Sequence, residues 1–310
     1  MSSAPPISAG DVDLVDLERS LRKPRSLLSW ALSLATGVMT LAALFPLFSV
    51  LYLLVVRGGA RLGLAVFTEL PPAALMPGGG FGNAIVGTLV IVGLATLLSV
   101  PIGILGAVYV AELGPDTRTA TTVRFCAKLL TGLPSILAGV FAFAAVVVVT
   151  GRFSAPAGGV ALAVLMLPIV LLTAEEALRS VPPRMREAAL GLGATRTQMV
   201  LRIVLPSALP GVLTGVMLAV ARAAGETAPL IFTALFSDFW ISNSAPVFVP
   251  KAIDDLMKPT PTLAVLIYNF SGSPFENQVE LAWTAALVLV FIVLLVNVTG
   301  QRLARWSARS

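Results

Sequence analysis

The chain has 310 residues, of which 57% are hydrophobic and only 12% are charged. Soluble domains carry about twice that charged share, so too little polar surface is available to cover a water-soluble body of this size. Histidine is absent and Cys126 is the single cysteine, which excludes a disulfide within the chain and disfavours metal sites and Ser/His or Cys/His catalysis.

The apolar residues lie in six long runs, each about long enough for a helix to cross a hydrocarbon core of about 30 Å. In chain order they are Leu27–Val56, Ala84–Ala111, Leu129–Val149, Gly158–Ala174, Ser207–Leu235 and Leu281–Gln301. Backbone groups in lipid must pair within their own segment, so the runs are expected to be helices. The sequence therefore predicts an all-α membrane protein with six transmembrane helices. No cleavage site follows the first run, which is interpreted as a retained span and not as a signal peptide.

Lys and Arg are distributed unevenly between the segments that join these spans. If the N-terminus is cytoplasmic, fifteen of the 21 lie in inner segments, five lie in outer segments, and Arg222 lies within a span. Cytoplasmic loops carry such an excess, so both termini are predicted to be cytoplasmic. The formal charge of +5 is then a signal of topology and not of nucleic-acid binding.

The runs divide the chain into predicted parts. These are a tail (1–26), a first transmembrane helix (27–56), an outer loop (57–83), a five-helix core (84–301) and a C-terminal tail (302–310). Within the core, an inner loop (175–206) and an outer segment (236–280) are expected to carry function. The outer loop is rich in Gly and Pro and is expected to be irregular. No Gly-Lys dipeptide occurs, so the chain lacks a phosphate-binding P-loop.

The inner loop carries signals for two short helices. Pro182 and Pro183 end the fourth span and open a new helix. Thr195 with Gln198 three residues later forms a capping box for a second helix, which is expected to end at Pro206. The two helices are predicted to form an elbow at the inner surface. They could lie on lipid, or the first could enter a groove of a partner protein.

Arg222 and Glu226 interrupt the fifth run near its middle. A charge at the bilayer centre costs about 2.5–3.5 kcal/mol, so two charges need a reason. Residues four apart share one helix face, and an ion pair that joins two helices is one interpretation. The other is a substrate site facing a pore, in which Arg222 offers planar, permanently charged donors to an oxyanion. Snorkelling is disfavoured, since both ends of the run lie about twenty ångströms away.

The inner loop also matches a known pattern. Glu187-Ala188-Ala189, three residues, Gly193, nine residues and Ile203-Val204-Leu205-Pro206 resemble, without a gap, the EAA loop of bacterial ABC import permeases. The resemblance implies the MetI-like architecture of type I importers, in which this loop is a coupling helix docked in a cleft of the ATPase dimer. It further implies that ATPase coupling is carried by Glu187, Ala188, Ala189, Gly193, Leu205 and Pro206.

The segment Arg222–Leu230, RAAGETAPL, is similar to a stretch of the PstA-type permeases of phosphate-specific ABC importers. The stretches 132–136, 178–182 and 263–268 agree, and the resemblance extends over about 84–298. It implies that Arg222, Glu226 and Thr227 line a translocation path for inorganic phosphate across a bacterial plasma membrane. The implied partners are a PstC-like second permease, a homodimeric ATPase and an extracytoplasmic phosphate-binding protein. The subunit itself would be non-catalytic, with no cofactor of its own.

A carboxylate beside an anion path requires an explanation. Monohydrogen phosphate carries a P–OH proton that Glu226 could accept in a hydrogen bond, whereas sulfate has no such proton and would be repelled. Other interpretations stay open: a permease for molybdate or sulfate, or a membrane scaffold for phosphate sensing. An integral-membrane enzyme is disfavoured by the missing P-loop and histidine. Lys251 and Lys258 either contact the binding protein or only solvate the outer segment.

Overall fold

The computed structural model describes the backbone of residues 24–241 and 253–307, and the side chains of 28–241 and 254–302. Within these ranges every regular element is a helix, as the sequence predicts. The chain divides into two units, Met1–Leu53 and Leu54–Ser310. The predicted N-terminal tail lies outside the described residues up to the start of the first helix. Lys251 and most of the C-terminal tail lie outside them too.

Helix α1 (Pro24–Gly59) forms the described part of the first unit and ends in the second. Its segment Leu28–Gly59 is long and apolar enough to cross a membrane, which confirms the first predicted span as a helix. Its last turn, which belongs to the second unit, packs closely on the last helix of the chain. A Cβ atom at Gly58 would lie 2.6 Å from the carbonyl oxygen of Trp283, so only glycine fits this contact.

The second unit is a bundle built around one central helix, α7 (Ala155–Arg179). It packs most extensively against α3 (Gly82–Val108) and α10 (Leu205–Ala224), and α10 packs in turn against α14 (Glu276–Ser307). The remaining helices are α2 (Ala65–Thr68), α4 (Arg118–Thr131), α5 (Ser135–Ala142), α6 (Val148–Thr150), α8 (Pro183–Gly191), α9 (Arg196–Met199), α11 (Ala228–Thr233), α12 (Ile253–Leu256) and α13 (Leu263–Ser271). Three π-helical turns join some of them: η2 (Tyr109–Leu113), η3 (Phe143–Val147) and η4 (Val200–Val204).

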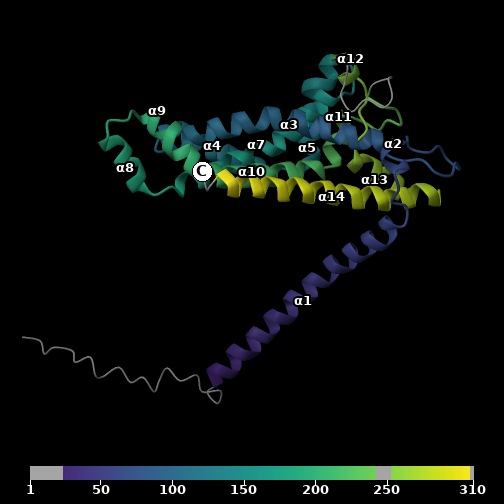
Figure 1. The fold of residues 1–310 in the computed structure, drawn as a ribbon, viewed down its shortest axis with the longest axis horizontal. Helices are drawn as coiled ribbons and strands as arrows, with labels where there is room; N and C mark the ends of the chain where they lie inside the picture. The colour runs from purple at the N-terminus through teal and green to yellow at the C-terminus, as the bar shows by residue number, and fades with distance from the viewer. Residues whose placement is uncertain (1–23, 242–252, 308–310) are drawn as a thin grey trace, which may run out of the picture. The chain divides into compact units, whose positions relative to one another are not determined.

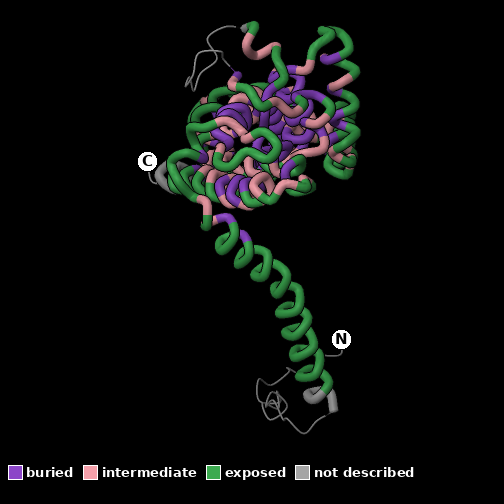
Figure 2. Tube along the Cα trace, turned by 90° about the vertical axis from the view of Figure 1, so that its right-hand side faces the viewer, coloured by how far each residue is buried: buried purple, intermediate pink, exposed green. Residues whose placement is uncertain are grey.

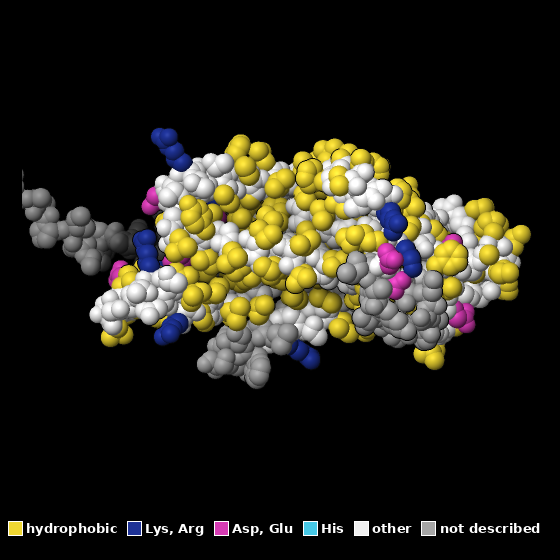
Figure 3. Space-filling model, turned by 90° about the horizontal axis from the view of Figure 1, so that it is seen from above, with side chains coloured by type: hydrophobic (Ala, Val, Ile, Leu, Met, Phe, Trp, Pro, Cys, Tyr) yellow, Lys and Arg dark blue, Asp and Glu magenta, His cyan; other side chains and the backbone are white. Residues whose placement is uncertain are grey.

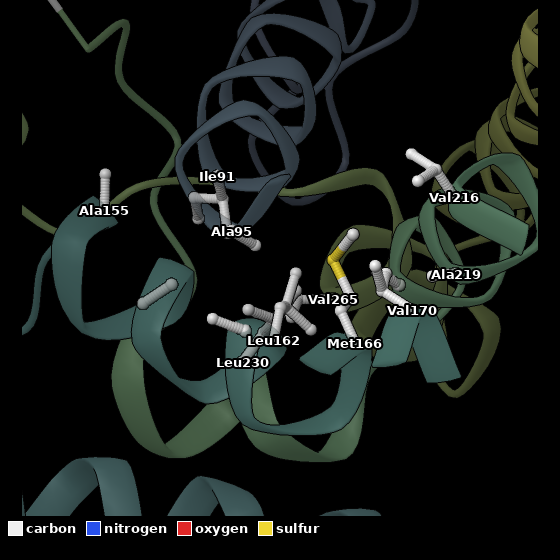
Figure 4. Close-up of a cluster of buried hydrophobic side chains, with 13 residues drawn as sticks. Ile91, Ala95, Ala155, Leu162, Met166, Val170, Val216, Ala219, Leu230 and Val265 are labelled. Carbon is white, nitrogen blue, oxygen red and sulfur yellow. The ribbon is translucent and has the colours of Figure 1, made fainter. Parts of the chain in front are cut away.

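The core of the bundle lies around α7. Side chains from α3, α7, α10, α11 and α13 converge there, including Ile91, Leu162, Met166 and Leu230 (Figure 4). Buried residues are gathered in the middle of this unit (Figure 2). Helices in lipid associate through close packing of small residues. A Cβ atom at Gly159 would lie 2.9 Å from Leu94, and this close approach joins α7 to α3.

The two ends of the bundle carry different short helices. Helices α8 and α9 lie at one end, hereafter the α8 end, and α2 and α12 lie at the other (Figure 1). Figure 3 shows a broad apolar belt between two ends where charged side chains gather. Among the described residues, five helices are long and apolar enough to cross a membrane, or six if one bent pair forms a single span. The structure thus agrees with the predicted number of spans.

The bent pair corrects the third predicted span. The run Leu129–Val149 is not one helix: α4 and the segment Ser135–Thr150 meet at an angle of 107°. Pro134 lacks a backbone N–H and disfavours helical geometry at the preceding residue, so the helix breaks there. The apolar span begins at Ser135, and Leu129 belongs to the more polar α4.

The outer segment also differs from a simple loop. Its helix α13 is largely buried against α14 and α3. The backbone N–H of Leu263 donates to the Thr88 hydroxyl of α3 at 2.9 Å, which fixes the start of α13 inside the bundle. The predicted outer loop is irregular over most of its length, with positive φ angles at Leu75, Gly78 and Gly79, but it also contains the one-turn helix α2, which the sequence did not predict.

Candidate functional site

The backbone conformation at the end of α8 explains why the EAA-like pattern requires Gly193. Helix α8 begins at Pro183 and is closed by a Schellman motif. The N–H of Ala194 donates to the carbonyl of Ala189 at 3.1 Å, and that of Gly193 donates to Leu190 at 3.0 Å. Gly193 has a φ of +85°, a conformation that side chains with a Cβ rarely adopt. The glycine of the pattern is therefore required for the turn that ends α8.

The predicted capping box is present. The hydroxyl of Thr195 accepts from the N–H of Gln198 at 3.3 Å, and the Gln198 side chain accepts from the N–H of Thr195 at 2.9 Å. The expected end of this helix at Pro206 is wrong. Helix α9 continues through η4 into α10, and Arg196–Ala224 forms one apolar helical segment of 29 residues. The π-helical turn directly before Leu205 and Pro206 accommodates the missing N–H of the proline.

One face of α8 is available to a partner. Glu187 and Ala188 are exposed, while Ala189 is buried in a cluster with Leu178 and Met199. Leu192, just past the helix, is 90% exposed. Met185 and Leu190 of α8 are exposed as well, and a group of exposed large apolar side chains is typical of an interaction surface. The structure thus separates the EAA residues into an exposed pair and a buried anchor.

The opposite face of α8 is held by Arg186. Its guanidinium donates to both carboxylate oxygens of Glu112 in η2, from Nε at 3.2 Å and from a terminal nitrogen at 2.6 Å. It also donates to the carbonyls of Val181 and Leu178 near the end of α7. The Glu112 side chain is only 6% exposed and that of Arg186 20%. This bidentate pair joins α8 to the ends of α3 and α7.

A second cluster lies beside it. Arg124 of α4 donates to Glu175 of α7 at 2.6 Å and to the backbone carbonyls of Val110 and Pro115. Arg179 also pairs with Glu175, at 2.9 Å. From the sequence, these arginines were predicted only to mark the topology, and no role was predicted for Glu112 or Glu175. An acidic residue at the end of an otherwise apolar run is the signal that could have identified both.

The fifth predicted span requires a correction that concerns the charged pair. Helix α10 ends at Ala224, and a new short helix, α11, begins at Ala228. Pro229 cannot continue α10, because its ring would clash with the carbonyl four residues earlier. Arg222 therefore lies in the last turn of α10, and Glu226 lies in the break. The two residues do not share one continuous helix, and they do not lie near the middle of one.

Arg222 and Glu226 nevertheless contact each other. The Nε of Arg222 lies 3.4 Å from one carboxylate oxygen of Glu226, and their side chains are 47% and 16% exposed. Arginine carries five N–H donors. Among the described residues, the other four N–H groups of Arg222 have no hydrogen-bond partner. Thr227 follows directly and is partly buried at the start of α11. The structure thus brings the three predicted site residues together at a break between helices, with most donors of Arg222 free.

An exposed groove runs beside the same face of α10. It has a volume of about 340 Å³ and is lined mainly by Thr173, Glu176, Ser180, Gly211, Thr214 and Leu218. Thr214, Leu218 and Arg222 follow one another at four-residue spacing, so they share one face of α10, and all three are exposed. The groove therefore extends along α10 on the face that carries Arg222.

Lys258 forms an ion pair with Asp255 at 3.0 Å, so its charge is partly neutralised within the outer segment. Lys251 lies outside the described residues. The structure leaves the predicted alternatives for these two lysines open.

Comparison with known proteins gives a consistent result. Residues 99–310 match the family described as "Binding-protein-dependent transport system inner membrane component". The phosphate transport system permease protein PstA of Yersinia pestis is 38% identical over 284 residues, which cover 92% of this chain and 91% of that protein. The phosphate transport system permease protein PstA 1 of Mycobacterium tuberculosis is 34% identical, covering 83% of this chain and 82% of the relative.

Solved structures show the same fold. A bacterial alginate ABC transporter in complex with a pentasaccharide-bound periplasmic protein aligns with a TM-score of 0.61 at 17% identity, covering 94% of this chain and 99% of that one. The methionine ABC transporter MetNI, in an inward-facing conformation, aligns with a TM-score of 0.54 at 21% identity, covering 73% and 93%. These identities show the fold alone. The family match and the identity to PstA proteins establish that the chain belongs to the inner membrane components of binding-protein-dependent transport systems, and among these to the PstA permeases.

Proposed function

We propose that the chain forms half of the pore of an ATP-driven importer that moves inorganic phosphate across the bacterial plasma membrane. The observation that carries the proposal is the Arg222–Glu226 pair, whose arginine keeps most donors free and lies one helical turn beyond Leu218 of the exposed groove. The substrate class follows from the relatives, which are named as phosphate transport permeases. The α8 end is proposed to face the cytoplasm. The excess of Lys and Arg in the predicted inner segments supports this orientation.

At the proposed site, Arg222 binds the phosphate oxygens through its free N–H groups. Glu226 accepts a hydrogen bond from the P–OH group of monohydrogen phosphate through its second carboxylate oxygen. Sulfate offers no proton there, so the same carboxylate repels it. The Arg222–Glu226 contact of 3.4 Å is long for a charge-assisted hydrogen bond, which supports an exchange of partners when the anion arrives.

Energy is supplied from outside the chain. A homodimeric ATPase is proposed to bind the exposed face of α8 at Glu187, Ala188 and Leu192 and to hydrolyse ATP, since the chain has no P-loop. A PstC-like permease would complete the pore, and an extracytoplasmic phosphate-binding protein would deliver the anion. The subunit needs no cofactor of its own in this mechanism.

The test is ATP-driven anion uptake into proteoliposomes that hold this chain with these partners, comparing phosphate, sulfate and molybdate. Wild-type protein should accumulate phosphate alone, and Arg222→Gln should abolish uptake. Arg202→Gln is the matched control, because Arg202 is an exposed arginine of the same helical segment with no ion pair among the described residues. Accumulation of another oxyanion would overturn the proposed substrate. Normal uptake by Arg222→Gln would remove the pair from the path.

A further inference from the structure

Among the described residues of α8, Arg186 is the one whose side chain makes hydrogen bonds to the bundle, in addition to the apolar packing of Ala189. Arg186 makes two hydrogen bonds to Glu112 and two to carbonyls near the end of α7. All three of its nitrogens are thereby used. A planar guanidinium held at this many points permits little sliding or rotation of α8 against η2. The contact is therefore suited to transmit a displacement of α8.

We propose that Arg186 and Glu112 form the joint through which a displacement of α8, imposed by the ATPase, moves α3, α4 and α7. Arg186 is thus a positioning residue for transport, acting through the bundle and not on the substrate. The proposal rests on the proposed function for the origin of the displacement.

The π-helical turn η2, which contains Glu112, is also hydrogen-bonded to α4. The carbonyl of Val110 accepts from Arg124 of α4 at 2.8 Å, and Arg124 also binds Glu175 of α7. One π-helical turn thus lies between a guanidinium of α8 and a guanidinium of α4. Since both carboxylates are buried and bonded, these contacts persist as α8 moves.

A further series of contacts leads from α4 to the Arg222–Glu226 pair. Helix α4 passes through its bend into α5, and α5 contacts α11 closely. A Cβ atom at Gly139 of α5 would lie 2.6 Å from the Cα of Pro229, three residues after Glu226. A contiguous series of tight contacts therefore joins α8 to the break that carries Glu226. Spatial continuity alone does not demonstrate coupling, so the experiment must measure coupling itself.

The first measurement is phosphate taken up per ATP hydrolysed by the assembled importer. Arg186→Lys keeps the charge but cannot hold four acceptors, and Glu112→Asp is one methylene too short to reach. Each variant should assemble and hydrolyse ATP, with uptake per ATP reduced about tenfold, within the range typical of coupling between sites. The double variant should be no worse than either single one, since both remove the same joint.

Arg118→Gln is the matched control, because Arg118 is an exposed arginine of α4 with no ion pair among the described residues, and it is not on the α8 face proposed to bind the ATPase. It should keep uptake per ATP within about twofold of wild type, well inside the coupling range. An unchanged ratio in Arg186→Lys, or an equal loss in Arg118→Gln, would overturn the joint.

A second measurement does not depend on the substrate. Cys126, the single cysteine, is exposed on α4 and can carry one spin label, and Arg184→Cys on α8 carries another, with cysteine-free partners. The distance between the labels should stay constant when ATP binds to the wild-type background and change in Arg186→Lys. A wild-type distance that changes as much as that of the variant would contradict the joint, even if phosphate proves to be the wrong substrate. Absence of phosphate uptake by wild type would contradict only the proposed function.

Discussion

The molecule uses the same two side-chain types, Arg and Glu, in two places and in opposite ways. At the α8 end, Arg186 spends all three nitrogens on Glu112 and two carbonyls, and the pair is largely buried. At the break after α10, Arg222 makes one long contact with Glu226 and is about half exposed. The difference teaches that an arginine of this protein is a candidate for binding when its donors stay free, and for structure when they are used.

The surroundings of each pair explain the difference. The end of α7 offers the carbonyls of Leu178 and Val181, and these two carbonyls complete the coordination of Arg186. The break at Gly225 offers Arg222 no comparable set among the described residues. Burial also lowers the local dielectric around Glu112, which strengthens its pair and raises the cost of breaking it.

The sharpest way to break the comparison is to remove one partner of the buried pair. Glu112→Gln leaves the Arg186 charge without its counter-ion, and we expect a loss of about 3–5 kcal/mol in the free energy of unfolding. Reversible unfolding of the purified permease in mixed micelles measures this loss. Glu176→Gln, an exposed acid on α7, should change the free energy of unfolding by less than about 0.5 kcal/mol. If Glu112→Gln and Glu176→Gln changed the free energy of unfolding equally, the buried pair would contribute no more to stability than an exposed carboxylate.

The next effect concerns the packing behind Glu226. Gly139→Ala places a methyl group 2.6 Å from the Cα of Pro229, so α5 and α11 must separate. We expect a cost of about 1–3 kcal/mol in unfolding free energy, as for overpacked cores. Gly132→Ala serves as control, since its nearest neighbouring atom would lie at an ordinary 3.6 Å. If Gly139→Ala were as stable as wild type, α5 and α11 could separate at almost no cost in free energy.

A smaller effect is expected at the end of α8. Gly193→Ala forces a side chain into a φ of +85° and should cost about 1 kcal/mol. Gly191→Ala lies in the helix with open space around it, so it should be neutral or slightly stabilising. Thermal unfolding of the two variants under identical conditions tests this difference. If both variants melt at the same temperature, the Schellman turn does not explain the glycine of the pattern.

The smallest effect on stability is expected at the open pair. Glu226→Gln should change the free energy of unfolding by less than about 1 kcal/mol, because the contact with Arg222 is long and partly exposed. Selectivity should change instead: sulfate uptake should rise relative to phosphate. Competition between the two labelled anions in proteoliposomes measures it. Unchanged selectivity would refute the role proposed for the carboxylate.

Local signals in the sequence predicted the helical fold, the capping box and the start of α8, because each depends on residues close in the chain. They also identified Arg222, Glu226 and Thr227 as neighbours. They did not predict that α10 stops at Ala224. Pro229, five residues further on, carries that information, but it lies within a long apolar run that by itself indicates one continuous helix. The buried pair of Arg186 and Glu112 joins residues 74 positions apart, which no local pattern could reveal.

The continuity of α9, η4 and α10 sets a scale for the motion that transport requires. From Arg196 to Arg222 the segment is about 39 Å long at 1.5 Å per residue. If it moves as a rigid rod pivoting near α9, a tilt of about 5° displaces Arg222 by about 3 Å, which is the length of a hydrogen bond. A small tilt at the α9 end of this segment is then enough to release an anion from Arg222 at the other end.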